Sequence, residues 1–446
     1  MPLTTRKRLL AAAASVVALA LPLAACSSAA PAGNAGGEIS YWLWDSNQLP
    51  AYQTCAADFT AANPDIKVKV EQYGWGDYWT KLTNGFVAGT APDVFTDHLA
   101  KYPEFVANNQ LAPLDDVALG EYQPGLADLW VGQDGVRYGV PKDFDTVAIF
   151  YNKKLVADAG VDEASLWDLD WNPADGGTYE KMAARLTVDK NGVRGDEPGF
   201  DKNNVAVYGL GMDGGAGGAW GQTQWSMYTG TTGWTHTDKN PWGTKFNFDA
   251  PEFQDTVAWM VSMVDKGYMP PLKAITGQGS SDIFAAGKYA MLINGSWMTN
   301  AFFNIDGVEV GVAPTPVGPN GARSSAYNGL ADSIWVGSKN QEAAKKWVAY
   351  LGSEACQLKV GEAAVVFPAN PKGTEAASKA FEAKGIDVSA FLTHLEEGTT
   401  SLLPIIDKSS QVDAIMGPAM DAVYSGQAPV SSLSEANKQV NALFNS

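Results

Sequence analysis

Residues 282–303, DIFAAGKYAMLINGSWMTNAFF, predict a helix, a buried strand, a tight turn and a second helix in close succession. Gly287 follows a short apolar run, which is typical of a helix C-terminus. The apolar run 289–293 has the length of a strand and is followed at once by turn residues. The stretch therefore predicts one unit of an α/β fold.

The turn that ends this strand carries a large aromatic residue. Asn294 and Gly295 supply turn chemistry, and Ser296 is suited to cap a helix that begins at Trp297. In open α/β sheets, ligands bind outside the carboxyl ends of the strands. Trp297 is either a core residue or part of a binding site, and this stretch alone does not decide between them.

The first residues have the pattern of an export signal. Arg6–Arg8 form a positive start, and the apolar stretch 9–21 is too short to span a bilayer. The small residues directly before Cys26 resemble the bacterial lipobox, in which the cysteine receives lipid and becomes the mature N-terminus. An ordinary secretory signal with an incidental cysteine is the alternative. We expect residues 1–25 to be a lipoprotein signal peptide and 26–37 to be a flexible tether.

These features predict an extracytoplasmic protein that is anchored to the outer face of the cell membrane through Cys26. The length of 446 residues favours two domains. The formal net charge of −18 argues against nucleic acid as a partner and is compatible with a monomer. The three histidines lie far apart, so no zinc or catalytic-histidine site is expected, and no cofactor is predicted.

Two cysteines, Cys55 and Cys356, remain after Cys26. Outside the cytoplasm such a pair tends to oxidise, but the sequence alone does not place the two side chains together.

Strands alternate with helices along the first part of the chain. The strand 38–44 ends at Trp44 and Asp45, and a short strand 93–96 ends at Asp97 and His98. This alternation predicts a mostly parallel sheet that is covered on both faces. The segment 138–152 is extended, and the pattern of strands and helices starts again after it.

Two loops of unusual composition follow. Residues 189–200, DKNGVRGDEPGF, loosely resemble a calcium loop but fail the EF-hand spacing, which favours a surface hairpin. The glycine run 214–218 precedes Trp220 and Gln222. Glycines beside aromatics can line a concave surface, although an irregular loop packed by its own aromatics fits as well.

Four stretches carry a family resemblance, in addition to the lipobox. They are GTAPDVF (89–95), YGVPKDFDTVAIFYNKKLVADAG (138–160), FAAGKYAMLINGSW (284–297) and NGLADSIWVGSKNQEAAKKWVAYLGSEACQ (328–357). In this order the chain resembles the extracytoplasmic solute-binding proteins of ABC importers, specifically the saccharide-binding, maltose-binding-protein-like group.

The resemblance implies an α/β, two-lobed periplasmic-binding-protein fold. Each lobe would be a mainly parallel sheet flanked by helices, with the ligand cleft between the lobes. The first lobe would comprise 38–143 and 329–365, and the second lobe 144–328 and 366–446. This division makes 138–152 a hinge crossing. It also places Cys55 and Cys356 in the same lobe, which implies a disulfide between them.

A sugar presents apolar C–H faces to aromatic rings and hydroxyl groups to carboxylates and amides. The resemblance gives priority to Asp45, Asp145, Trp220 and Trp297 as ligand-binding residues. The remaining candidates lie at strand ends, at the crossings or beside the glycine run: Trp44, Trp75, Tyr78, Asp97, His98, Gln222 and Asn328. Helix capping or hinge hydrogen bonding is the alternative role for Asp45 and Asp145.

The sequence departs from the maltose-binding group in one respect. That group uses basic residues near the first strand, whereas Ser46 and Asn47 stand there in this chain. The 15 tryptophans, many in turn-like settings, favour a neutral oligosaccharide. The partners would then be a saccharide and the membrane permease of an ABC transporter.

Two other classes of protein remain open at this stage. A secreted glycoside hydrolase would also carry aromatics and carboxylates, but no catalytic pair of carboxylates stands out. A binding protein for a non-sugar solute, such as a polyamine or a peptide, is the other alternative.

Overall fold

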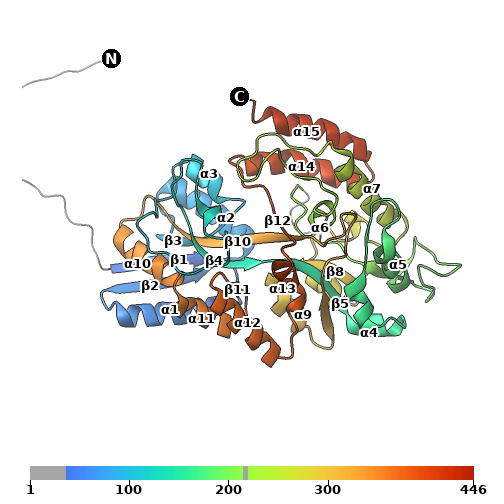
Figure 1. The fold of residues 1–446 in the computed structure, drawn as a ribbon, viewed down its shortest axis with the longest axis horizontal. Helices are drawn as coiled ribbons and strands as arrows, with labels where there is room; N and C mark the ends of the chain where they lie inside the picture. Colours follow the sequence, from blue (N-terminus) through green and yellow to red (C-terminus); the bar gives the residue numbers. More distant parts are fainter. Residues whose placement is uncertain (1–36, 214–218, 446) are drawn as a thin grey trace, which may run out of the picture.

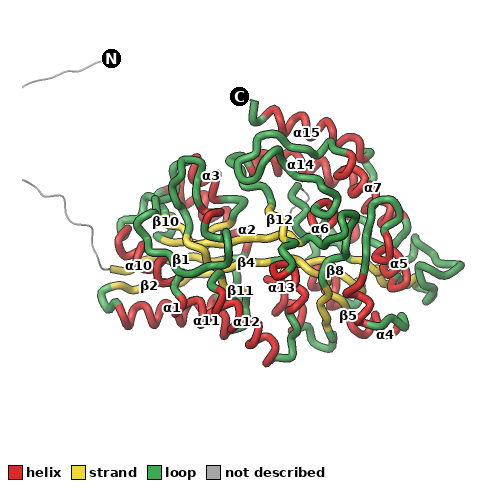
Figure 2. Tube along the Cα trace, viewed as in Figure 1, coloured by secondary structure: helices red, strands yellow, loops and turns green. Residues whose placement is uncertain are grey.

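The computed structural model describes residues 37–213 and 219–445, which form two α/β lobes side by side (Figure 1). The first lobe is built on a seven-stranded sheet and the second lobe on a five-stranded sheet. Strands run through the middle of each lobe and helices cover them, as Figure 2 shows. The predicted two-lobed α/β fold is therefore confirmed.

The sheet of the first lobe has the order β11-β4-β10-β3-β1-β2, with β12 paired to β10. Parallel pairs join β1 to β2 and to β3, as the alternation of strands and helices predicts. The strands are β1 Gly37–Leu43, β2 Ile66–Gln72, β3 Val94–His98, β4 Val140–Asp145, β10 Ser325–Ile334, β11 Phe367–Pro368 and β12 Thr400–Leu402.

The sheet of the second lobe has the order β6-β7-β8-β5-β9. Its central strand β8 contains the apolar run 289–293, and all seven of its residues are buried. The strands are β5 Val147–Asn152, β6 Val188–Asp189, β7 Val205–Leu210, β8 Tyr289–Gly295 and β9 Val310–Ala313.

The sheets are mixed, so the prediction of mainly parallel sheets is wrong in this detail. β10 runs antiparallel to β3 and β4, and β5 runs antiparallel to β8 and β9. The reason is topological: β4, β5 and β10 lie where the chain passes between the lobes. They join each sheet without the helical crossover that a parallel neighbour needs.

Helices cover both faces of the first sheet. Residues of α1, α10 and α11 pack with β1 in one buried cluster, and residues of α2 and α3 pack with β3 in another. The helices of the chain are α1 Leu49–Ala62, α2 Trp75–Ala88, α3 Tyr102–Ala107, α4 Lys153–Asp158, α5 Gly177–Leu186, α6 Ser226–Thr229, α7 Pro251–Asp265, α8 Ser280–Ala285, α9 Thr299–Phe303, α10 Gln341–Leu351, α11 Glu354–Glu362, α12 Pro371–Ala383, α13 Ser389–Glu396, α14 Ser409–Tyr424 and α15 Leu433–Ala442. Short 3-10 turns are η1 Asp128–Trp130, η2 Glu163–Asp168, η3 Leu272–Ala274, η4 Ser296–Met298 and η5 Val430–Ser432.

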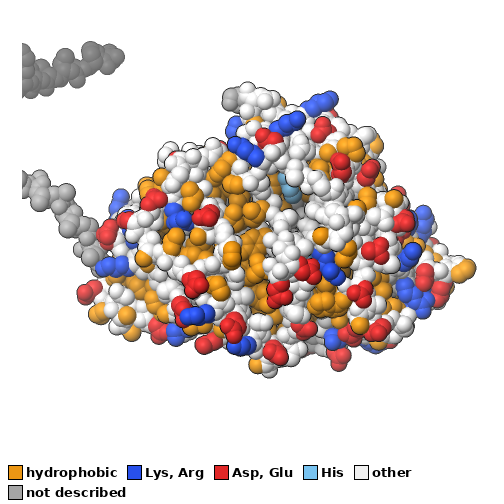
Figure 3. Space-filling view, in the orientation of Figure 1, with side chains coloured by type: hydrophobic (Ala, Val, Ile, Leu, Met, Phe, Trp, Pro, Cys, Tyr) orange, Lys and Arg blue, Asp and Glu red, His pale blue; other side chains and the backbone are white. Residues whose placement is uncertain are grey.

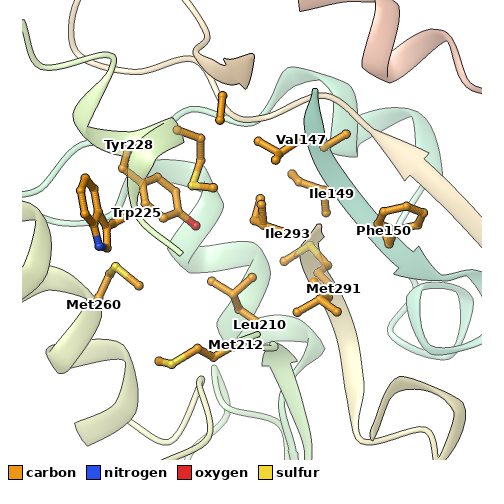
Figure 4. Packing of buried hydrophobic residues seen from close by; sticks show 14 of the residues in the cluster. Val147, Ile149, Phe150, Leu210, Met212, Trp225, Tyr228, Met260, Met291 and Ile293 are labelled. Atoms are coloured by element: carbon orange, nitrogen blue, oxygen red, sulfur yellow. The ribbon is translucent and has the colours of Figure 1, made fainter. Parts of the chain in front are cut away.

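The core of the second lobe lies between its sheet and α7. Ile149 of β5, Met291 of β8 and Leu210 of β7 point into it, together with Trp225 and Met260 (Figure 4). Because the sheet is covered on both faces, its strands consist of nearly continuous apolar residues. This core gives the end of β8 a fixed position.

The chain crosses between the lobes along β4 and β5. β4 belongs to the first sheet and β5 to the second, and only Thr146 separates them. The start of β10 lies beside this crossing, because the Ser325 hydroxyl accepts from the Val147 N–H at 2.8 Å. The apolar run 333–336 by itself predicts a strand that follows the turn-like residues 328–332, whereas β10 already begins at Ser325 and includes them.

The exact division into lobes stays a prediction. β11 pairs with β4 of the first sheet, and α12 packs on α11, so residues 367–383 lie beside the first lobe. α13 then contacts β5 of the second lobe.

Cys55 of α1 and Cys356 of α11 form a disulfide, with their Cα atoms 5.5 Å apart. The bond joins residues that are 301 positions apart in the chain. It lies in the buried cluster between these helices and the first sheet.

Cys26 and the glycine run lie outside the described residues. Over 37–213 and 219–445, no helix combines the length and the apolar composition that a membrane span needs.

Candidate functional site

Aromatic rings gather at the carboxyl end of β1. The Trp44 ring lies 5.1 Å from the Trp75 ring, 5.2 Å from Tyr78 and 5.3 Å from Trp79, measured between centroids. His98 completes this aromatic cluster, 5.8 Å from Trp75. The structure thus brings together four of the predicted residues from β1, α2 and β3.

Trp75 is the accessible member of the aromatic cluster. Its side chain is 45% exposed, and Trp44 and Trp79 are half-buried. Sequence reasoning missed Trp79, although it stands four residues after Trp75 on the same helix, a spacing that places both on one face. An exposed indole ring that packs against other aromatic rings is suited to stack on an apolar face of a ligand.

Three predicted residues of this region are buried. The Tyr78 hydroxyl donates to the Thr96 carbonyl at 2.6 Å, which uses its polar group within the protein. Burial raises the pKa of Asp97 to about 8, partly offset by the His98 N–H that it accepts. Burial lowers the pKa of His98 to about 3, so its ring is neutral. These groups support the aromatic cluster, and a direct ligand contact for them stays a prediction.

Carboxylates converge beside the aromatic cluster at the crossing between the lobes. Asp45 accepts from the Asn47 N–H at 2.8 Å and from the Gln48 amide at 3.2 Å. Asp145 accepts from the Ser296 hydroxyl at 2.6 Å, and its β10 neighbour across the sheet is Asn328. The Asp145–Ser296 bond thus joins the crossing to the second lobe, and Asp45 of the first lobe is near enough for its charge to act on Asp145.

Burial raises the pKa of Asp145 to about 8, and the nearby carboxylates Asp143 and Asp45 add to this rise. Burial also raises the pKa of Asp45, while its hydrogen bonds oppose the rise. Each of these carboxyl groups therefore holds a proton more tightly than an exposed aspartate does.

One buried cation balances this group. The Lys142 ammonium lies 2.6 Å from Asp143, contacts the Gln48 side chain, and sits 4.4 Å from the centre of the Tyr52 ring. Burial alone would lower the pKa of Lys142, but Asp143 and its other neighbours raise it above the ordinary value. The lysine is already paired, so it does not offer a free cation to an anionic ligand.

Trp297 lies at the end of β8, on the side of the second lobe. Its ring covers Gly295 so closely that a Cβ there would come within 1.9 Å of the ring. The side chain packs against the second-lobe core yet stays partly exposed.

Ser296 does not cap the helix after it, so that prediction is wrong. The 3-10 turn η4 begins at Ser296 and α9 begins at Thr299. The Ser296 hydroxyl is taken by Asp145, and its N–H donates to the Thr146 carbonyl at 2.9 Å. The serine therefore ties β8 to the crossing, a role that local sequence patterns do not reveal.

Trp220 and Gln222 make their described contacts with other second-lobe residues. The Trp220 ring is 9% exposed and lies 6.4 Å from Phe246. The Trp220 side chain also hydrogen-bonds Asp413 on α14. Burial raises the pKa of Asp413, and this hydrogen bond opposes the rise. The Gln222 amide nitrogen is buried without a hydrogen-bond partner among the described residues.

Backbone hydrogen bonds to the Asp189 carboxylate hold the loop 189–200 together. Asp189 accepts from the Asn191, Val193 and Asp201 N–H groups at 2.8, 2.9 and 2.9 Å. These bonds occupy both of its oxygens, which supports the surface-turn interpretation. Within the part of the chain that the structure describes, no group of three His, Cys, Asp or Glu side chains is arranged to hold a metal ion.

Residues 45–357 match the bacterial extracellular solute-binding protein family. This match covers more than half of the chain. The chain belongs to that family. It is therefore an extracellular solute-binding protein and not an enzyme.

Individual relatives span most of this solute-binding protein. A maltodextrin-binding protein of Bacillus subtilis is 27% identical over 402 residues, which cover 88% of this chain and 87% of the relative. A galactooligosaccharide-binding protein of the same organism is 26% identical over 350 residues, covering 76% and 75%.

Solved structures share the fold. UspC of M. tuberculosis is 27% identical with a TM-score of 0.71, and the match covers 91% of this chain and 99% of UspC. An ABC substrate-binding protein of Listeria monocytogenes, in complex with cycloalternan, is 21% identical with a TM-score of 0.76, covering 91% and 98%.

Proposed function

We propose that this solute-binding protein captures a neutral saccharide, most simply an oligosaccharide, between its two lobes for an ABC importer. The observation that carries the proposal is the juxtaposition of the aromatic cluster with Asp45, Asp145 and Ser296. Rings can cover the apolar faces of a sugar while carboxylates and amides take its hydroxyl groups. The relatives named for maltodextrins and galactooligosaccharides support the same ligand class.

The charges of the site favour a neutral ligand. Asp45, Asp143 and Asp145 lie together with Lys142 as a paired cation. Lys142 is already paired with Asp143 and offers no free positive charge to an anionic sugar. The charge of such a sugar would also repel the carboxylates of this group that are ionised, at a free-energy cost. Acidic and basic side chains are interspersed over the face shown in Figure 3, where hydrophobic side chains gather near the centre between the lobes.

Each predicted residue has a role in this proposal. Trp44 and Trp75 stack on the ligand from the first lobe, and Trp297 and Trp220 from the second. Asp45, Asp145, Asn328 and Gln222 bind hydroxyl groups. Tyr78, Asp97 and His98 complete the predicted set next to Trp44. The ligand bridges the lobes, stabilises the closed form, and presents a docking face to the permease.

A thermal-shift panel tests the ligand class. A ligand that binds only the folded state raises the melting temperature. At a ligand concentration of 100 times the dissociation constant, the free energy of unfolding increases by about 2.7 kcal/mol. We expect neutral oligosaccharides to raise the melting temperature and the matching uronic-acid oligosaccharides to leave it unchanged. A shift with polyamines or peptides and none with any saccharide would contradict the proposal.

We further propose that lipid on Cys26 anchors the protein at the outer face of the membrane and that it works as a monomer. The pattern before Cys26 supports this anchor. A Cys26→Ser variant should move from the membrane fraction to the medium. Retention of this variant on membranes would contradict the anchor.

A further inference from the structure

The N-terminus of α14 contacts the first lobe, although the helix packs in the second. Val412, Met416 and Met420 of α14 belong to the same buried cluster as β5 and β8. At its first turn, however, the Ser409 hydroxyl donates to the Ala100 carbonyl at 2.6 Å. Ala100 lies between β3 and α3 of the first lobe.

Glu104 of α3 binds this first turn with both carboxylate oxygens. The Ser410 N–H donates to one oxygen at 2.7 Å, and the Ser410 hydroxyl donates to the other at 2.6 Å. Beside this contact, the Gln133 amide donates to Asp407 at 3.1 Å. These polar contacts of Ser409, Ser410 and Asp407 with the first lobe are called here the α3–α14 contact.

Glu104 supplies the capping hydrogen bond that no residue of α14 itself provides. The residue before the helix, Lys408, makes no side-chain capping hydrogen bond. The first N–H groups of a helix have no partner within the helix and carry a partial positive charge. A carboxylate that accepts from the Ser410 N–H therefore caps α14 from the opposite lobe, with a charge-assisted bond.

The contact also has an apolar part. Ile405, directly before α14, is fully buried in the cluster that contains Tyr102 and Trp130 of the first lobe. The Trp242 N–H donates to the Ile405 carbonyl at 2.8 Å, and the Trp242 ring lies 6.1 Å from Tyr102. Separation of α3 from α14 would therefore break polar contacts and expose apolar surface together.

The contact lies next to the candidate site. α3 begins shortly after β3, which ends at Asp97 and His98. Glu104 itself is absent from the groups that we propose to touch the sugar. Glu104 also lies near Asp413, whose side chain hydrogen-bonds Trp220, so an influence of Glu104 on binding acts either through the relative position of the lobes or through Trp220. A change in the radius of gyration of the ligand-free protein distinguishes the first route from the second.

We propose that Glu104 is a positioning residue that caps α14 across the lobe boundary and thereby favours the closed, sugar-binding form. This inference rests on the proposed function. A bond present only in the closed form raises affinity by shifting the population toward that form, without any ligand contact.

The test compares Glu104→Ala, Glu104→Gln and Ser410→Ala with a matched control, Glu375→Gln. Glu375 pairs only with Lys379 on the same exposed helix face in the described structure, so its loss should leave binding unchanged. For Glu104→Ala we expect the dissociation constant of the best saccharide from the panel to rise about tenfold, as a charged hydrogen bond predicts. This rise should come from faster dissociation of the saccharide. The dissociation constants of Glu104→Gln and Ser410→Ala should lie between those of the unmodified protein and Glu104→Ala.

Small-angle X-ray scattering of the ligand-free proteins separates positioning from a purely structural role. Loss of the α3–α14 contact should make the radius of gyration of ligand-free Glu104→Ala larger than that of the ligand-free unmodified protein. With saturating saccharide, the two proteins should reach the same radius. A lower melting temperature with unchanged affinity and unchanged radius would overturn the inference, because the contact would then belong to one rigid body. If the unmodified protein binds no saccharide, the proposed function fails, while the ligand-free radius still tests the contact.

Discussion

At the scale of single residues, the two lobes contribute different groups to the candidate site. Asp45 stands at the end of β1, and its oxygens already accept from Asn47 and Gln48. Trp297 stands on the second lobe, over Gly295. If the ligand bridges the lobes, loss of either side chain must weaken binding.

We expect Asp45→Asn and Trp297→Ala each to weaken saccharide binding by about 1–4 kcal/mol, as for the loss of a hydrogen bond to a carboxylate or of an aromatic anchor. Titration calorimetry measures the change. Asp58→Asn serves as control because Asp58 pairs with Lys359 on the surface of the first lobe, at 2.7 Å. Unchanged affinity in both site variants would place the ligand elsewhere.

The buried carboxyl of Asp145 predicts a pH dependence of stability. Burial raises its pKa to about 8 in the folded state, whereas an unfolded aspartate has a pKa of about 3.9. Between these values the folded protein holds one more proton than the unfolded chain does. The contribution of Asp145 to stability is therefore complete below about pH 4 and is lost as the pH rises through about 8.

Replacement of Asp145 by Asn removes this contribution. The melting temperature of Asp145→Asn should consequently fall less between pH 5 and pH 8.5 than that of the unmodified protein. Asp97 and Asp332, whose pKa values burial raises to about 8 and about 7, retain a similar dependence in the variant. An equal fall of the melting temperature in the two proteins between pH 5 and pH 8.5 would contradict the raised pKa of Asp145.

At the scale of elements, the sequence predicted those parts whose cause is local. The run 66–72 alternates apolar and polar residues and forms β2 over the same residues. Ala343, Ala344 and Trp347 recur at helical spacing in 340–351, and this segment forms α10 with all three buried. Periodicity and turn chemistry suffice for such elements because their apolar faces determine how they pack.

The parts that failed depend on partners distant in the chain. Ser296 has the local pattern of a cap, but Asp145 takes its hydroxyl from 151 positions away. Asn328 and Gly329 favour a turn by their residue types, whereas pairing with β4 makes both of them part of the strand β10. Trp75 and Trp44 were identified as separate candidates, and only the structure shows that their rings touch.

The bond between Cys55 and Cys356 gives a prediction at this scale. It joins α1 to α11 across 301 positions, so its loss releases a long loop in the unfolded chain. In the chain-entropy model the bond stabilises the fold by up to about 5 kcal/mol. Reduction should add the mass of two hydrogen atoms and lower the melting temperature, and a Cys55→Ser/Cys356→Ser variant should not respond to reductant. An unchanged intact mass after reduction under denaturing conditions would show free thiols.

At the scale of the whole molecule, the connections between the lobes decide how a binding event becomes a signal. β4 passes into β5 through Thr146 alone, and β10 lies beside this passage. Few residues therefore need to change their backbone angles for the lobes to rotate. Two buried clusters, one on each face of the first sheet, lie within the first lobe, while the cluster of the second lobe extends across the crossing to Phe144 of β4 and Phe367 of β11.

This architecture predicts compaction on ligand binding. A saccharide that contacts Asp45 on one lobe and Trp297 on the other stabilises the form in which both are within reach. The radius of gyration measured by small-angle X-ray scattering should therefore fall when saturating saccharide is added to the unmodified protein. Trp297→Ala should need more saccharide for the same change, because one side of the bridge is weakened. Tight binding with no change of radius in either protein would show that the ligand occupies one lobe only, and the permease would then have to recognise the ligand and not the closed shape.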